Sequence, residues 1–206
     1  QPSRAKSIQI FFEPLKSGKG GRLALVSSLV WLAALCAEQM FAHWAEWGNL
    51  SIDCGRELYA AAALAQGKML YRDVWYSYTP ASPYFNSCLF RLFGTRMEVL
   101  YWAGSLSALA CAVMLFLVGR KFGSLLAGVA AGTVVLLQAF QPWLFSFPLP
   151  YSFASVYGCV ASCLFLCLAI QAAESANILW VVACGITAAL AVLLKLEFGV
   201  ACYGGL

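Results

Sequence analysis

Charge is what this sequence has least of. Only 11% of its 206 residues are Asp, Glu, Lys or Arg, whereas a soluble domain carries about a quarter. Acidic residues number nine, and His43 is the only histidine. This scarcity excludes an ordinary soluble domain. The net charge of +4 is also spread over separate places, with no basic stripe that would suit nucleic acid.

Several catalytic and metal-binding signatures are also missing. The sequence has no glycine-rich nucleotide-binding loop and no Ser/His/Asp arrangement. Cys159, Cys163 and Cys167 recur every four residues in an apolar run, without histidine or carboxylate partners, so we expect them to serve helix packing. Cys54 and Cys88 lie outside the apolar runs and can pair in an oxidising compartment, a point that the sequence leaves open.

Long apolar runs fill most of the chain. Hydrophobic residues make up 62% of it, and its mean hydropathy is +0.78. Because about 20 apolar residues span a bilayer as a helix, we predict an all-α, polytopic membrane helix bundle. The expected spans are residues 23–41, 99–118, 122–140, 151–173 and 176–194, with a sixth run starting at Phe198. A chain that stops inside that run, at Leu206, is expected to be part of something longer.

The basic residues predict an orientation. The tail, residues 1–22, and the turn at Arg120 and Lys121 are both basic and fall on one side if the spans alternate. The positive-inside rule makes that side cytoplasmic, so the loop 48–96 faces outward. We therefore expect a multi-pass protein of the bacterial plasma membrane with a cytoplasmic N-terminus, within a transmembrane domain at 23–206. An endoplasmic reticulum protein would have the same geometry.

The outward loop is the only long polar stretch and is predicted to contain two short interfacial helices. The first has Asp53 as its N-cap and stops at Gly67. The second starts at Ser82, with serine as the cap, and ends at Gly94. Its apolar residues form one stripe, and its polar residues Asn86, Ser87 and Arg91 lie on the other side.

The ordered series of motifs in this loop resembles a family. Asp53-Cys-Gly-Arg56-Glu57-Leu-Tyr59, Gly67-Lys68-Met-Leu-Tyr71-Arg72-Asp73, Tyr78-Thr-Pro80-Ala-Ser-Pro83-Tyr84 and Leu92-Phe93-Gly94 are its four pieces. They resemble the first outer loop of polyprenyl-phosphate-sugar-dependent glycosyltransferases of the C-type fold, such as protein O-mannosyltransferases and aminoarabinose transferases. Leu194-Lys195-Leu-Glu197-Phe-Gly199 is similar to a segment of their bacterial members. The resemblance covers about residues 51–199.

The resemblance implies roles for particular residues. The family's catalytic carboxylate matches Asp53, but the second acid that many relatives have next to it is Cys54 here. Glu57, one turn further along, is the candidate to share the catalytic site. Contact with the lipid phosphate falls to the cations of the outward side, because a departing phosphate needs positive charge. Those cations are Arg56, Lys68, Arg72 and Lys195. Helix capping by Asp53 and surface ion pairs of the others are the simpler alternatives.

The expected function is therefore transfer of a sugar from a polyprenyl-phosphate donor to an acceptor on the outer face of the cell envelope. The partners are that donor and membrane lipid. No cofactor is required, although a divalent cation is compatible with Asp53. The alternative is a non-catalytic, shortened relative that acts as a scaffold in a larger membrane complex. Full-length relatives have about twice as many spans, which favours that alternative.

Overall fold

The structure is a computed structural model that describes residues 19–44, 46–48, 51, 53–142, 146–175 and 177–204. It is all-α over this part of the chain, as the sequence predicts. Its helices are α2 (Lys19–Ala42), α3 (Asp53–Ala65), α4 (Ala81–Phe93), α5 (Met97–Phe122), α6 (Leu125–Ala139), α7 (Phe153–Ser175), α8 (Ile178–Leu194) and α9 (Leu196–Gly204). The basic tail, residues 1–18, lies outside the described residues.

Among the described residues, three helices are long and apolar enough to cross a membrane, which indicates a membrane protein. They are Gly20–Ala42 within α2, together with α5 and α7. The other two expected spans are shorter than predicted: α6 has 15 residues and α8 has 17. Each starts late because a polar side chain caps it. Ser124 Oγ accepts a hydrogen bond from the Ala127 N–H, and Asn177 Oδ1 accepts one from the Leu179 N–H.

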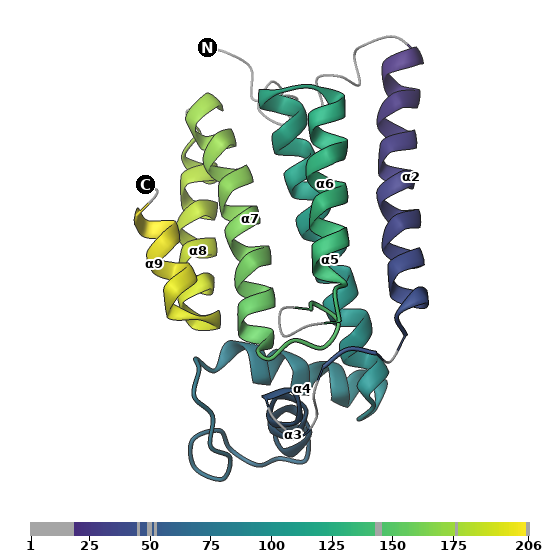
Figure 1. Cartoon of the computed structure of the whole chain (residues 1–206). Coiled ribbons are helices and arrows are strands. Elements are labelled where there is room, and N and C mark those ends of the chain that lie inside the picture. The colour runs from purple at the N-terminus through teal and green to yellow at the C-terminus, as the bar shows by residue number, and fades with distance from the viewer. Residues whose placement is uncertain are drawn as a thin grey trace.

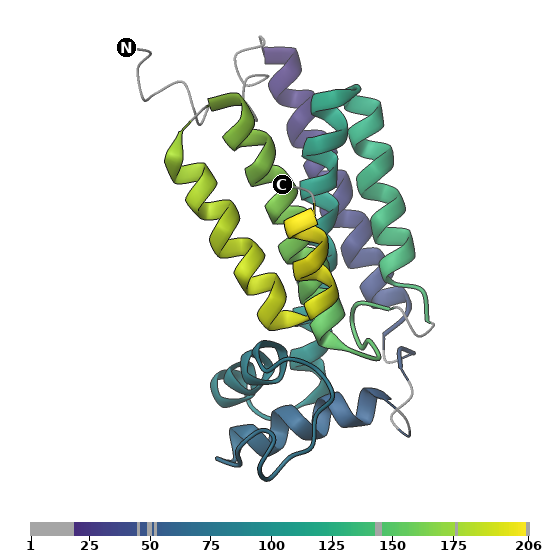
Figure 2. The same ribbon diagram turned by 90° about the vertical axis from the view of Figure 1, so that its left-hand side faces the viewer.

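The long helices stand side by side, and two short helices lie across one end of them (Figure 1). The bundle helices are α2, α5, α6, α7 and α8, and the shorter α9 packs beside α7 and α8 (Figures 1 and 2). The crossing helices are α3 and α4, at the end of the bundle opposite the start of α2 (Figure 1). The loop that the sequence placed on the outward side therefore forms one built layer.

Close helix contact joins α5 to α6, where Gly128 and Gly132 lie four residues apart on α6. A Cβ on Gly128 would meet the Phe116 carbonyl oxygen at 2.6 Å, and one on Gly132 would lie 2.9 Å from Leu32 of α2. Glycine is needed at these positions because any side chain would push the helices apart. The three helices α2, α5 and α6 therefore form a tight group.

The end of α3 explains why the first short helix stops where the sequence predicts. Gly67 has a φ of +92°, a conformation that glycine adopts without steric cost. Its N–H donates to Leu64 O at 3.0 Å, and the Lys68 N–H donates to Ala63 O at 3.1 Å. These two bonds are the Schellman pattern of a helix C-terminus. At the other end, Asp53 is the first helical residue rather than a cap outside the helix.

The second short helix, α4, buries two polar side chains and exposes much of its apolar stripe. Asn86 and Ser87 are buried, whereas Phe85, Leu92 and Phe93 are half exposed or more. A helix in water would do the opposite, so this arrangement fits an element whose outer surface meets lipid. The predicted serine cap is wrong: α4 starts at Ala81, after Pro80, and no side chain caps it. Ser82 is instead buried inside the helix.

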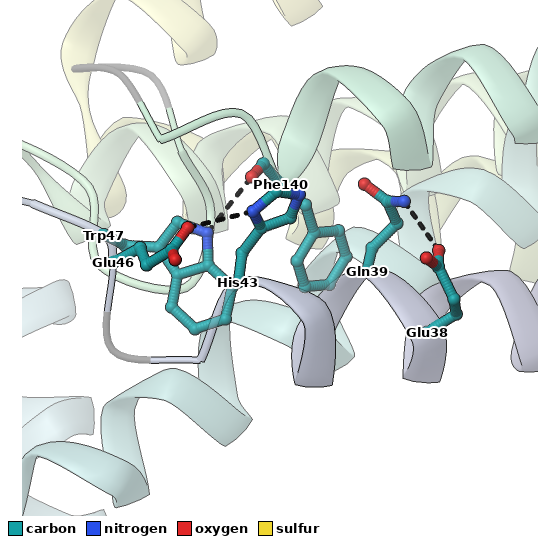
Figure 3. Close-up of polar contacts among 6 residues, drawn as sticks. All are labelled: Glu38, Gln39, His43, Glu46, Trp47 and Phe140. Atoms are coloured by element: carbon teal, nitrogen blue, oxygen red, sulfur yellow. Dashed lines mark hydrogen bonds and ion pairs between the residues drawn. The ribbon is translucent and has the colours of Figure 1, made fainter.

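Polar side chains anchor the end of α2 near the same layer (Figure 3). His43 Nδ1 lies 3.1 Å from Glu46 Oε2, and Trp47 Nε1 donates to Phe140 O at 3.1 Å. Glu38 Oε2 accepts a hydrogen bond from Gln39 Nε2 at 2.6 Å. His43, the single histidine of the sequence, is thus a hydrogen-bonding residue at the helix end, beside tryptophans of the kind that are enriched at membrane interfaces.

Candidate functional site at the bundle end

Asp53 begins the site at the first turn of α3. Its Oδ1 lies 3.2 Å from Arg56 Nη1, and its side chain is 37% exposed. The two residues are three apart, so the helix itself brings the carboxylate and the guanidinium together. Asp53 is accordingly a partly exposed carboxylate at the end of the bundle opposite the start of α2 (Figure 1).

Two cations from distant parts of the chain meet at one tyrosine ring. Arg56 Cζ lies 5.4 Å from the centre of the Tyr78 ring, and Lys195 Nζ lies 5.2 Å from it. Lys195 also donates hydrogen bonds to Tyr151 Oη at 3.2 Å and Ser155 Oγ at 3.0 Å. We call Asp53, Arg56, Tyr78 and Lys195 the cationic site. This site joins the outward loop to the break between α8 and α9. The sequence places both segments on the outward side, which agrees with this contact.

Arg56 retains donors that no protein group uses. Its Nε and Nη2 atoms are buried and have no hydrogen-bond partner among the described residues. Thr79 Oγ1, next to Tyr78, and Ser152 Oγ, next to Tyr151, are likewise buried without a hydrogen-bond partner among the described residues. Buried donors without partners are rare in folded proteins, because each such donor costs about 1–3 kcal/mol. Such a set is suited to holding water or a polar ligand.

Glu57, predicted to share the catalytic site, lies in the interior instead. It is 2% exposed, and it accepts hydrogen bonds from Tyr76 Oη at 2.9 Å and the Phe153 N–H at 3.1 Å. Burial raises the pKa of Glu57 to about 7, although the two hydrogen bonds and Arg56 favour its charged form. Burial and the adjacent Glu57 also raise the pKa of Tyr76. Glu57 thereby ties α3 to the start of α7.

Lys68 and Arg72 interact with other groups. Lys68 Nζ lies 5.8 Å from the Tyr59 ring centre. Arg72 binds its neighbour Asp73 through two hydrogen bonds, of 2.9 and 2.8 Å. These bonds, with the Met69 N–H, lower the pKa of Asp73 to about 2. Of the four predicted phosphate ligands, Arg56 and Lys195 are thus the two that the structure brings together.

An apolar groove of about 600 Å³ runs from this end of the bundle along α4, α5, α7 and α8. We call it the large groove. Its lining is almost entirely apolar, and Ser107, Tyr157 and Thr187 are the lining residues that carry a hydroxyl group. Leu194, which lines it, is the residue before Lys195. The large groove therefore reaches the residue that directly precedes Lys195 of the cationic site.

The cysteines and carboxylates provide no metal site in the described part of the chain, where no group of three or more His, Cys, Asp or Glu side chains converges. Cys54 and Cys88 form no disulfide with each other, so the pairing that the sequence left open is not formed. Cys54 is buried, and its Sγ donates to Leu149 O at 3.6 Å.

Sequence reasoning missed the tyrosines and serine that complete the site. Tyr76, Tyr78, Tyr151 and Ser155 lie in segments that read only as aromatic turns or helix starts. The one signal for them was the density of aromatic residues around Tyr78 in an otherwise polar loop. Their contacts with Glu57 and Lys195 cross from 19 positions of sequence, for Tyr76 and Glu57, to 117 positions, for Tyr78 and Lys195, and no local pattern encodes such separations.

Comparison with protein-family models, curated proteins and solved structures finds no match to this chain. The resemblance to C-type glycosyltransferases therefore stays an expectation, and the function has to be argued from the site itself.

Proposed function

We propose that this protein is a membrane glycosyltransferase that moves a sugar from a polyprenyl-phosphate donor to an acceptor at the membrane face carrying α3 and α4. The supporting observation is the position of the cationic site beside the large groove. A donor of this class is a long apolar chain joined to a phosphate. The groove suits the chain, and Arg56 with Lys195 suits the phosphate.

The reaction would be an inverting displacement at the anomeric carbon. The acceptor oxygen or nitrogen forms a bond to that carbon while the bond to the phosphate oxygen breaks. The acceptor proton passes to Asp53, and the electron pair of the broken bond stays on the lipid phosphate. Arg56 and Lys195 would stabilise that charge, and the unpartnered Nε and Nη2 of Arg56 are available to do so.

This proposal gives unequal roles to the residues predicted from sequence. Asp53 is the base, Arg56 and Lys195 bind phosphate, and Glu57 positions α3 against α7. Lys68 and Arg72 stay outside the donor contacts, because Tyr59 and Asp73 occupy them. Arg56 and Lys195 already supply two positive charges to balance the charge of the departing phosphate. A divalent cation is therefore not needed for this purpose.

The decisive experiment is the Asp53→Asn change in the full-length protein. We expect it to lower sugar transfer about 10²- to 10⁴-fold, the usual contribution of a general base, while membrane insertion is unchanged. Transfer is measured with a radiolabelled polyprenyl-phosphate sugar. The matched control is Asp73→Asn, because Asp73 is paired with Arg72 outside the site, and this variant should keep full transfer. Equal activity of the two variants would reject Asp53 as the base.

A scaffold role is the second candidate, and the Asp53–Arg56 contact favours it. A carboxylate and guanidinium three residues apart on a half-exposed helix is also an ordinary surface ion pair. Under this alternative, the full-length wild-type protein would transfer no sugar and would be recovered in a complex with other membrane proteins.

A further inference from the structure

A second groove opens on the other side of α4, and the donor proposal does not use it. Its volume is about 510 Å³, and the end of α2, α4 and the start of α5 line it. We call it the tryptophan groove, after Trp44 and Trp102. It shares the wall residues Leu89, Ala103 and Leu106 with the large groove, so the two grooves are separated only by side chains of α4 and α5.

One end of the tryptophan groove carries one charge of each sign. Arg96 directly precedes α5, and Glu98 lies in its first turn. Both side chains are exposed and line the groove. Arg96 Nη2 donates to Phe93 O at 3.3 Å, and the described residues show no ion pair between Arg96 and Glu98. Arg96 and Glu98 thus lie at the same end of the groove. Arg96 can donate further hydrogen bonds to a ligand there, and Glu98 can accept them.

The other end of the groove is apolar and lies deeper along α5. Leu106 follows Glu98 by eight residues, which is about 12 Å along a helix axis. Charged groups at the mouth and leucines at that depth match the polarity profile of a membrane leaflet. Trp44 and Trp102 flank the mouth, where tryptophan favours the head-group zone.

The tryptophan faces are partly occupied by other aromatic rings. Trp44 stacks on Phe41 with ring centres 6.2 Å apart, and Trp102 meets the edge of Phe41 at 6.3 Å. Open aromatic faces are the usual binding site for a quaternary ammonium group. Because these faces are partly covered here, the groove is better suited to an ammonium group that donates hydrogen bonds to a carboxylate.

We propose that the tryptophan groove binds a phospholipid whose head group carries both a phosphate and a primary ammonium, that is, a phosphatidylethanolamine. Arg96 would hold the phosphate, and Glu98 would accept hydrogen bonds from the ammonium. One acyl chain would lie against Leu89 and Leu106. A head group that is only anionic would meet Glu98 unfavourably, and trimethylammonium has no N–H to donate.

The test is native mass spectrometry of the purified full-length protein with equal amounts of dioleoyl phosphatidylethanolamine, phosphatidylcholine and phosphatidylglycerol. We expect the ethanolamine lipid to be retained at least fivefold over each of the others. Arg96→Gln and Glu98→Gln should each remove this preference, and Leu106→Trp should lower retention of all three lipids. Leu126→Trp, on an exposed position of α6, and Arg72→Gln, outside the groove, are the matched controls and should change nothing.

Equal retention of the three lipids would overturn the proposal. Preference for phosphatidylglycerol would exclude a role for Glu98, and preference for phosphatidylcholine would assign recognition to the tryptophans instead. Because Arg96 Nη2 also donates to Phe93 O, the Arg96 variant can also disturb the turn between α4 and α5. The wild-type protein then provides the test with mono-, di- and trimethylated ethanolamine lipids. Retention should fall with each methyl group, and a flat series would contradict the assignment.

Discussion

The single residue with the most consequence for stability is Glu57. Its carboxyl group is 2% exposed, and burial raises its pKa from the ordinary 4.5 to about 7. Between these two pH values the folded protein binds a proton that the unfolded chain releases. The stability that protonated Glu57 contributes is therefore complete below pH 4.5 and is lost as the pH rises through 7.

We predict that thermal stability falls between pH 5 and pH 8 because of this group. The full effect is about 3 kcal/mol, since each unit of pKa difference corresponds to about 1.4 kcal/mol. Glu57→Gln keeps an acceptor for the Tyr76 hydroxyl and the Phe153 N–H and carries no charge, so its melting temperature should vary less with pH. The measurement is thermal unfolding in detergent at both pH values, with the exposed Glu197→Gln as control. A variant as sensitive to pH as the wild type would disprove this.

At the residue scale, three of the residues selected from the sequence lie together in the structure, whereas Glu57 lies in the interior. Asp53, Arg56 and Lys195 could be selected because charge is rare in a membrane chain and therefore informative. The burial of Glu57 could not be foreseen, since it depends on Tyr76 and on a backbone N–H that follows it by 96 positions. The position of Lys68 could not be foreseen either. It depends on the fold of residues 68–80, which turns Lys68 toward Tyr59.

At the scale of elements, periodicity and end signals predicted the helices well. Gly67 stops α3 through its positive φ, and the spans of α2, α5 and α7 match their apolar runs. The burial of α4 was harder to predict. The sequence of α4 shows its apolar stripe. Which face is buried depends on whether the surroundings are water or lipid, and residues 81–93 alone do not specify this.

The contact between α5 and α6 supports a prediction about helix packing. Gly128→Ala places a methyl group 2.6 Å from Phe116 O, so the helices have to separate, and we expect a loss of about 2 kcal/mol or more. Gly185→Ala is the matched change, because no atom lies within 4 Å of its Cβ and alanine favours a helix. Melting temperatures should fall for the first variant and stay level or rise for the second. Similar values for both would show that α5 and α6 do not pack this closely.

For the whole molecule, the charges predict which face of the membrane carries the site. An impermeant maleimide added to intact cells should label Ser77→Cys, in the loop between α3 and α4, beyond the wild-type background. It should not label Phe122→Cys, at the opposite turn after α5. Both positions are exposed, so accessibility differs only through the membrane. Labelling of the second variant alone would reverse the orientation and move the site to the cytoplasm.

The length of α8 also bears on the thickness of the bilayer around it. With 17 residues, α8 is about 25 Å long, whereas the hydrocarbon core of a bilayer is about 30 Å. Lys195 ends this helix, so its ammonium group would be submerged in acyl chains unless the lipids around α8 compress or the helix rides toward one surface. Under the proposed function, a leaflet that thins around α8 would bring the phosphate of the donor lipid to the depth of Lys195, below the head groups of the surrounding lipids.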